Sequence, residues 1–148
     1  MDIKGRLWIY EGTKEYQTKM NHFRNGKFYP YKDSLGKLTI GCGHLVLKNE
    51  TFSDGITEKE ADILLSRDLA NVILEVQSLE LNVPDDWNDF MIIMTFQLGI
   101  NGVKKFKRMI NALQVKNFRE AIVQAKDSLW YRQTPNRVDD MIRQLTNK

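Results

Sequence analysis

A capping box at residues 57–60 marks the start of the longest helix that this sequence predicts. The Thr57 hydroxyl can accept a hydrogen bond from the backbone amide of Glu60, and the Glu60 carboxylate can accept one from Thr57. Apolar residues then recur at helical spacing as far as about Leu79, in one stripe made of Ala61, Leu65, Leu69, Val72 and Val76. A helix of about 20 residues is about 30 Å long. It can therefore join two lobes of a small domain.

Short strands are predicted before this helix. Residues 37–44 alternate as a strand does, which predicts Leu38, Ile40 and Cys42 on one face and Thr39 on the other. The remaining expectations are a helix at 3–11 ended by Gly12, a polar stretch at 12–27 with a turn at Asn25-Gly26, an extended aromatic run at 28–31, and turns at 33–36 and 54–55. Together these segments predict a small antiparallel sheet.

Only helices are predicted after the long helix. Pro84, followed by two aspartates, is typical of a helix start. Residues 90–98, ended by Gly99, are apolar enough for a helix buried on most sides. Further expectations are a turn at Asn101-Gly102, helices at 103–113 and 118–128, and a helix capped by Thr134 that starts at Pro135 and ends near Leu145.

The predicted fold class is therefore α+β, mainly α, with two lobes in a single domain of residues 1–148. The small sheet lobe is expected at about 12–56 and the connecting helix at about 57–80. The helical lobe is expected to comprise about 81–148 together with residues 1–11.

Composition excludes several classes of protein. The 148 residues include 42% hydrophobic and 28% charged residues, which suits a folded domain with a polar surface. We expect no membrane span and no signal peptide, because no apolar run is long enough. The net charge of +3 is modest, and the basic cluster at 104–108 lacks the interleaved aromatics of a single-strand binder, so no nucleic-acid partner is expected. Cys42 is the single cysteine, which excludes an internal disulfide.

Two carboxylates and a hydroxyl are candidates for chemistry. Glu11 is predicted at a helix C-terminus, where the negative end of the helix dipole favours a protonated carboxyl. Asp33 starts the turn before the strand that carries Thr39, whose hydroxyl could hold a water molecule. Each position also has an ordinary structural explanation, because an aspartate before Ser-x-Gly commonly caps a turn.

The order of the motifs carries more information than any one of them. Glu11-Gly12, Asp33 and the run from Thr39 to Leu45 (Thr-Ile-Gly-Cys-Gly-His-Leu) are followed by similar segments at 55–61, 96–99, 101–106 and 130–137. This ordered set resembles the phage-type (T4-type) lysozymes of glycoside hydrolase family 24, and the likeness covers nearly the whole chain.

The resemblance implies a role for each matching residue. Glu11 is expected to be the general acid, Asp33 the base or an electrostatic partner of the transition state, and Thr39 the residue that places the attacking water. Inversion at the anomeric carbon is implied, with no metal and no cofactor. Arg137 resembles an arginine that pairs with the catalytic glutamate, and His44 is expected to pair with Asp68.

The resemblance also implies a saccharide-binding set. Leu45, Phe96 and Gln97 match positions that line the saccharide cleft in the family, although core packing is an equal alternative for Leu45 and Phe96. Met109 and Gln124 occupy two further positions but differ from the family in residue type. Trp130 is expected in the core.

Two features leave alternatives open. A Cys42–His44 nucleophilic pair is conceivable if a strand places both on one face, but a buried, inert Cys42 is preferred. The stretch between Glu11 and Asp33 spans 21 residues and is longer than in the family. Its added part, about Gln17 to Phe28, is expected to lengthen the hairpin and loop out, although a role at the cleft edge or in binding wall peptide or protein is possible.

The function implied is endo-acting hydrolysis of β-1,4 bonds between N-acetylmuramic acid and N-acetylglucosamine in bacterial peptidoglycan, for phage-driven host lysis. A monomer is expected, without stable membrane association. It would wait in the host cytoplasm until a membrane-permeabilising partner releases it to the periplasmic wall. The alternatives are a virion-borne lysozyme that opens the wall during infection, and a catalytically inactive wall-binding or protein-interaction module.

Overall fold

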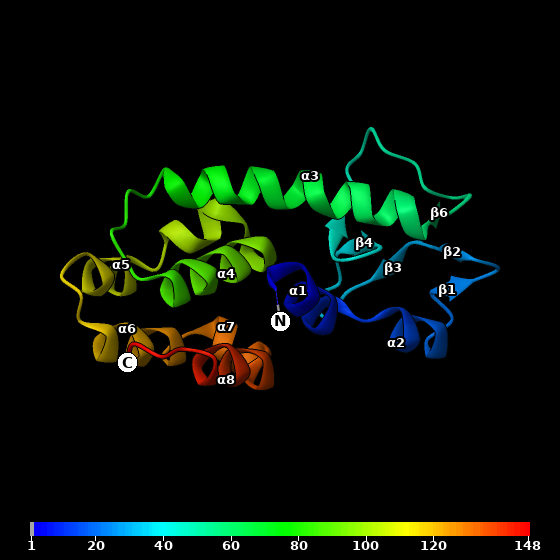
Figure 1. The fold of residues 1–148 in the computed structure, drawn as a ribbon. Coiled ribbons are helices and arrows are strands. Elements are labelled where there is room, and N and C mark those ends of the chain that lie inside the picture. Colours follow the sequence, from blue (N-terminus) through cyan, green and yellow to red (C-terminus); the bar gives the residue numbers. More distant parts are fainter. Residues whose placement is uncertain (1) are drawn as a thin grey trace. The chain divides into compact units, whose positions relative to one another are not determined.

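The computed structural model describes residues 2–148, and their internal contacts form two compact units, 1–70 and 71–148. The elements that start in the first unit are α1 (Ile3–Glu11), α2 (Lys14–Lys19), β1 (Phe23–Arg24), β2 (Lys27–Phe28), β3 (Tyr31–Lys32), β4 (Leu38–Ile40), β5 (His44–Leu45), β6 (Ile56–Thr57) and α3 (Glu58–Gln77). Those of the second are α4 (Asp85–Lys104), α5 (Lys107–Gln114), α6 (Phe118–Lys126), α7 (Leu129–Gln133) and α8 (Pro135–Arg143). The α+β, mainly α class is confirmed (Figure 1). The lobe boundaries expected from the sequence stay a prediction.

The first unit contains two three-stranded antiparallel sheets. One has the order β1-β2-β6 and the other β3-β4-β5. Phe28, Ile40, Ile56 and Ala61 form the buried core beneath them, and Trp8 of α1 packs on Phe28 at a ring distance of 5.5 Å. This packing joins α1 to both sheets and so determines where the C-terminal end of α1 lies.

The long helix α3 starts as its sequence predicts. The Glu60 amide donates to the Thr57 hydroxyl at 3.1 Å, and the Thr57 amide donates to the Glu60 carboxylate at 2.9 Å, which confirms the capping box. All five residues of the predicted apolar stripe are buried. No helix in the described part of the chain is long and apolar enough to cross a membrane.

The stretch at 12–27 differs from expectation. It neither loops out nor merely lengthens the next hairpin, because residues 14–19 form α2, and β1 and β2 form a separate hairpin that pairs with β6. The Asn25-Gly26 turn is confirmed, with φ of 53° and 76° at its two central residues. Thr13 caps α2 by accepting from the Tyr16 amide at 3.1 Å.

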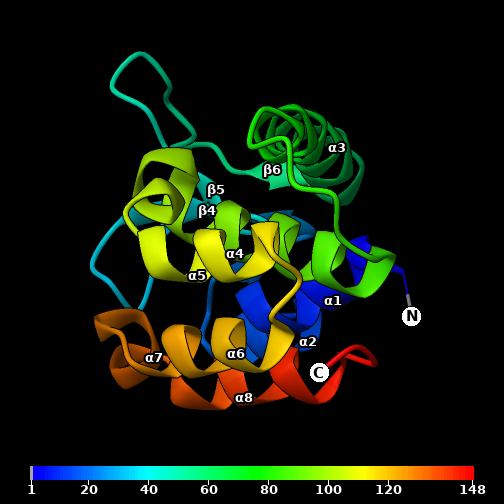
Figure 2. The same cartoon turned by 90° about the vertical axis from the view of Figure 1, so that its left-hand side faces the viewer.

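The second unit is wholly helical, as predicted (Figure 2). Trp87, Phe90 and Trp130 lie in its core, and residues 90–95 of α4 are all buried. The turn expected at Asn101-Gly102 is wrong: α4 is broken at Gly99, with φ 74° and ψ 156°, and then continues to Lys104. The helix expected from 103 therefore starts only at Lys107, and α7 is an additional short helix.

The C-terminal end of this unit is tied to the first turn of α4 by hydrogen bonds to a side chain. The Asp86 carboxylate on the first turn of α4 accepts from the backbone amides of Thr146 and Asn147 at 2.9 and 2.8 Å.

Pro135 begins α8 as predicted, but Thr134 does not cap it with its side chain. The Thr134 hydroxyl donates to the Trp130 carbonyl instead.

Candidate active site

Glu11 is the last residue of α1, and its carboxyl group packs directly on a glycine of the facing turn. The helix starts at its cap Asp2 and ends because Gly12 takes a φ of 117°. A Cβ atom placed on Gly43 would lie 2.8 Å from Cδ and Cγ of Glu11 and 2.9 Å from its Oε2. Only a residue without a side chain leaves room for the Glu11 carboxyl here.

The turn that faces Glu11 corrects the expectation of one continuous strand over residues 37–44. The chain reverses between β4 and β5, with positive φ at both Gly41 and Gly43. Thr39 pairs with Leu45 across this reversal. Leu38 is exposed, whereas Thr39, Ile40 and Cys42 are all buried, so the predicted alternation of faces does not hold.

Thr39 lies at the centre of the β3-β4-β5 sheet. Its backbone is in register with Tyr31 on one side and Leu45 on the other. Its hydroxyl donates to the Lys37 carbonyl at 2.8 Å, so the oxygen lone pairs face away from that bond. The Thr39 hydroxyl is thus oriented as an acceptor.

Asp33 caps the turn between β3 and β4. Its Oδ1 accepts from the backbone amides of Leu35 and Lys37 at 2.9 and 2.8 Å. The structural role expected for an aspartate before Ser-x-Gly is therefore present. These bonds hold the carboxylate on the side of the hairpin where β3 ends.

Tyr31 links the three predicted catalytic residues. Its hydroxyl donates to the backbone carbonyl of Glu11 at 3.3 Å, and its backbone pairs with Thr39. Burial raises the pKa of the Tyr31 phenol, and the negative charges of Glu11 and Asp33 raise it further. Nothing in the local sequence pattern marked Tyr31, because a tyrosine in an extended aromatic run is ordinary.

His44 is held between two carboxylates. Its Nδ1 lies 2.7 Å from Asp68, the pairing that the family resemblance implies, and its Nε2 lies 2.9 Å from Glu50. Since both ring nitrogens contact carboxylates, neither is available to a Cys42 thiol, and Cys42 is buried. The nucleophilic Cys–His alternative therefore has no geometric support. Glu50 lies in an irregular loop and carried no sequence signal.

This cluster predicts a pH dependence of stability. The hydrogen bond to Asp68 raises the pKa of His44 above its ordinary 6.5; burial opposes this, and the Glu50 bond adds to it. Burial opposes a lowered pKa of Glu50 as well, but hydrogen bonds from the Leu47 amide and His44 bring it below 4.5. The His44 contribution is complete below pH 6.5 and is lost as pH rises through its raised pKa. The Glu50 contribution is lost as pH falls through its lowered pKa.

Replacing Asp68 with Asn tests the pH range over which the His44 cluster stabilises the fold. We expect Asp68→Asn to cost about 1–3 kcal/mol of unfolding free energy at about pH 6 and clearly less at about pH 9, because only the protonated imidazole gains from the charge of Asp68. Urea unfolding at both pH values measures the difference. Asp62→Asn is the control, because Asp62 lies on the same helix in an exposed pair with Lys4. An equal loss for Asp68→Asn at both pH values would contradict the assignment.

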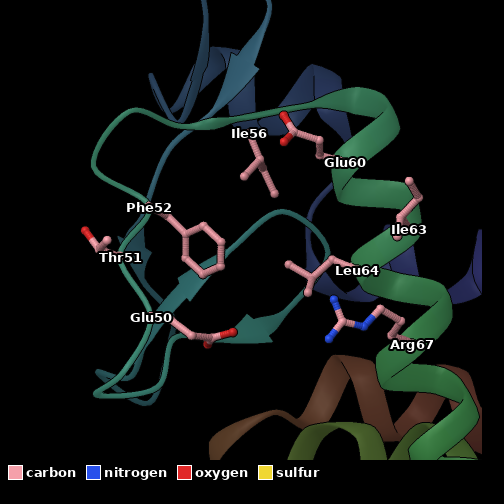
Figure 3. Close-up of a pocket in the computed structure, with 8 residues that line it drawn as sticks. All are labelled: Glu50, Thr51, Phe52, Ile56, Glu60, Ile63, Leu64 and Arg67. Atoms are coloured by element: carbon pink, nitrogen blue, oxygen red, sulfur yellow. The ribbon is translucent and has the colours of Figure 1, made fainter.

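A hollow of about 410 Å³ lies beside this cluster, between the loop at 50–56 and α3. Figure 3 shows Phe52, Ile56 and Leu64 pointing into it, with Glu50 and Arg67 facing each other across it. None of the predicted catalytic residues lines this hollow.

The second unit carries the other predicted binding residues. Met109 and Gln124 come together, because both line a hollow of about 380 Å³ with Phe106 and the basic residues Lys105, Lys107 and Arg108. Met109 is fully buried, and the Gln124 amide donates to Glu120 at 2.7 Å.

The other residues that the family resemblance assigned to binding or support lie on three elements: Phe96 and Gln97 on α4, Arg137 on α8, and Leu45 on β5 of the first unit. The Gln97 side-chain oxygen accepts from the indole of Trp130 at 2.7 Å, and Trp130 is buried as predicted. Phe96 and Arg137 are partly buried. Leu45 is 47% exposed, so core packing does not explain it. The pairing of Arg137 with Glu11 stays a prediction.

Comparisons with known proteins agree with this fold. The family model described as Phage lysozyme matches residues 22–145. The protein named Probable T4-type lysozyme 1 of Dictyostelium discoideum is 30% identical over 146 residues, covering 78% of this chain and 84% of that protein. Probable T4-type lysozyme 2 of the same organism is 27% identical over 143 residues, with the same coverage of both chains. Pre-baseplate central spike protein Gp5 of Enterobacteria phage T4 is 32% identical over 134 residues, covering 72% of this chain but only 23% of that protein.

The fold and these matches define a glycoside hydrolase of the lysozyme class, whose substrate is peptidoglycan. The chain belongs to the phage lysozyme family.

Proposed function

We propose that this lysozyme is an endo-acting N-acetylmuramidase that inverts the anomeric centre, with Glu11 as acid, Asp33 as base and Thr39 as the residue that holds water. The observation that carries the proposal is the contact of the Glu11 carboxyl with Gly43, in the turn that directly follows Thr39 and Ile40. This contact brings a carboxyl at a helix end to the hairpin that bears the other two groups.

Glu11 protonates the glycosidic oxygen as its bond to C1 of N-acetylmuramic acid breaks. A general acid must be held within hydrogen-bonding reach of the leaving oxygen. The Glu11 backbone is held by the Tyr31 hydroxyl, and its side chain by the wall formed at Gly43. The leaving group departs as the 4-hydroxyl of N-acetylglucosamine.

Asp33 and Thr39 act on the attacking water. The water donates to the Thr39 hydroxyl oxygen, which is free to accept because the hydroxyl hydrogen is donated to the Lys37 backbone carbonyl. Asp33 takes a proton from this water as its oxygen bonds to C1 from the face opposite the leaving group, which inverts the configuration. The turn bonds to Asp33 Oδ1 hold the carboxylate in position for this step.

The residues proposed to contact the sugar chain are Leu45 in the first unit and Phe96, Gln97 and Gln124 in the second. Met109 is fully buried, so it shapes the wall of the hollow and does not itself contact sugar. Leu45 offers exposed apolar surface at the second residue pair from the turn. The hollow at Met109 and Gln124 combines apolar and amide groups with three cations and one carboxylate, that of Asp127. Apolar surface with a few polar groups suits an N-acetylated sugar, and the cations suit the carboxylates of wall peptides.

Product chemistry tests this proposal. Purified Gram-negative peptidoglycan is digested, reduced with borohydride and analysed by mass spectrometry. A muramidase leaves reduced N-acetylmuramic acid at the new ends, which is the expected result. Reduced N-acetylglucosamine ends, or 1,6-anhydro ends that are not reduced, would overturn it. The first-formed anomer, followed by NMR, tests inversion separately.

The alternative of an inactive wall-binding module makes a different prediction. Such a module would sediment with purified wall but release no new reducing ends. The presence of Glu11, Asp33 and Thr39 around Tyr31 favours the enzyme.

The biological role we propose is lysis of a bacterial host at the end of phage infection. The enzyme acts as a monomer, remains in the host cytoplasm and reaches the periplasmic wall after a membrane-permeabilising partner opens the inner membrane. The similarity to a phage spike protein favours a second candidate, a virion-borne lysozyme for wall penetration. Mass spectrometry of purified virions separates the two, because only the second predicts this chain in the particle.

A further inference from the structure

Gln17 is a buried polar residue that joins the helix end at Glu11 to the catalytic hairpin. It lies on α2, in the stretch between Glu11 and Asp33, and it is 1% exposed. Its side-chain Nε2 donates to two backbone carbonyls at once, that of Gly12 at 2.8 Å and that of Gly41 at 2.9 Å. Gly12 follows Glu11 directly, and Gly41 is the first residue of the turn that carries Gly43.

The orientation of this amide is determined by its two acceptors. Reversing the amide would point Oε1 at two carbonyl oxygens, so the NH₂ group must face them. Oε1 is then buried with no hydrogen-bond partner in the described structure. A buried acceptor without a donor is unfavourable and calls for an explanation. We explain this cost by a requirement for the two hydrogen bonds that Nε2 donates, which join Gly12 to Gly41.

The same segment supports Glu11 by a second route. The His22 backbone amide donates to the Gln17 carbonyl at 2.7 Å, and the His22 ring stacks on Tyr31 at 4.3 Å with an interplanar angle of 5°. Tyr31 in turn donates to the Glu11 carbonyl. The residues between Glu11 and Asp33 therefore hold the Glu11–Gly12 backbone from two sides.

We propose that Gln17 is a positioning residue that sets the distance between the general acid Glu11 and the hairpin bearing Asp33 and Thr39. This inference rests on the proposed catalytic roles. Gln17 touches neither substrate nor reacting atoms. It acts by joining the two backbone segments whose separation the reaction depends on, and a misplacement of about 1 Å is enough to cost activity.

Gln17→Met tests the proposal, because methionine has similar length and volume but no donor. We expect kcat on a soluble, uncrosslinked peptidoglycan chain to fall about ten-fold or more, with KM changed less than about two-fold, since Gln17 does not contact sugar. Rates are measured at a temperature where circular dichroism shows every variant folded. The control is Phe23→Leu, which removes core packing from the same segment and should lower Tm while leaving kcat unchanged.

A double-mutant cycle combines Gln17→Met with Tyr31→Phe and measures the coupling between them in kcat. A general loss of stability would produce no such coupling. Tyr31 holds the Glu11 carbonyl and Gln17 holds the carbonyl of the adjacent Gly12, so their effects on kcat should be non-additive in the cycle. Additive effects of the two changes, or an unchanged kcat in folded Gln17→Met, would overturn the positioning role. If Phe23→Leu lowers kcat as much as Gln17→Met does, loss of packing explains the effect and the positioning role is overturned.

The proposed function fails in a different way. If wild type releases no new reducing ends, or if a folded Glu11→Gln variant matches wild type, the catalytic assignment fails whatever Gln17 does. If wild type is active, Glu11→Gln is inactive and Gln17→Met is normal, only the positioning role fails.

Discussion

Glu11→Gln is expected to lower kcat on peptidoglycan about 10³-fold or more while leaving the fold intact, because the amide cannot supply the proton that the leaving oxygen needs. The substitution keeps the size of the side chain, so it preserves the packing on Gly43. Binding to insoluble wall should persist, because the change removes a proton donor and not a sugar contact. Turbidity clearing of chloroform-treated Gram-negative cells, with release of reducing ends, measures the effect.

Glu15→Gln is the matched control for this experiment. It makes the same chemical change four residues later, at an exposed position in the first turn of α2. We expect wild-type kcat for it and an unchanged Tm for both variants. Equal clearing by wild type and Glu11→Gln would remove Glu11 from the role of acid, even though the chain would remain a member of its family.

Gly43→Ala is expected to have the second-largest effect, with kcat lowered about 100-fold. The new Cβ atom would lie 2.8 Å from two carbon atoms of Glu11, so the carboxyl must move. The backbone φ of 68° adds strain for any residue with a side chain. That strain costs about 1–2 kcal/mol of stability, which a protein of this size can tolerate.

Gly26→Ala separates the displacement of Glu11 from the backbone strain. Gly26 has a similar φ of 76°, but nothing lies within 4 Å of an added Cβ atom. We expect a comparable loss of unfolding free energy in urea with kcat close to wild type. If Gly26→Ala and Gly43→Ala lose kcat to the same extent, strain alone explains the loss and the contact with Glu11 does not position the acid.

Local patterns predicted the helices and turns well wherever the deciding contacts lie within a few residues. The bonds between Thr57 and Glu60 span three residues, and Gly12 ends α1 by its own backbone freedom. The Asn25-Gly26 turn is equally local. Such features need no partner from elsewhere in the chain, so residue types and spacing suffice.

Local sequence patterns gave wrong predictions where the backbone conformation depends on more than the pattern itself. Residues 37–44 alternate like a strand, but the chain reverses at Gly41 and Gly43. Gly43 then packs on the Glu11 carboxyl, 32 positions away in sequence. Asn101-Gly102 has a strong turn composition, yet both residues are helical, and the break occurs at the exposed Gly99, directly after the apolar run at 90–98.

The sequence by itself determined the fold class, the long helix α3 and, through its ordered motifs, the lysozyme family. It also selected Glu11, Asp33 and Thr39 as candidates, but it could not show that they meet. Only the tertiary structure decided that the residues after Glu11 fold into α2 and a separate hairpin, that Gln17 joins Gly12 to Gly41, and that Glu50 completes the His44 cluster. The physical reason is the sequence separation of the interacting residues. Periodicity and caps record interactions within about one helical turn, whereas an active site is made by side chains whose separation along the chain leaves no periodic trace.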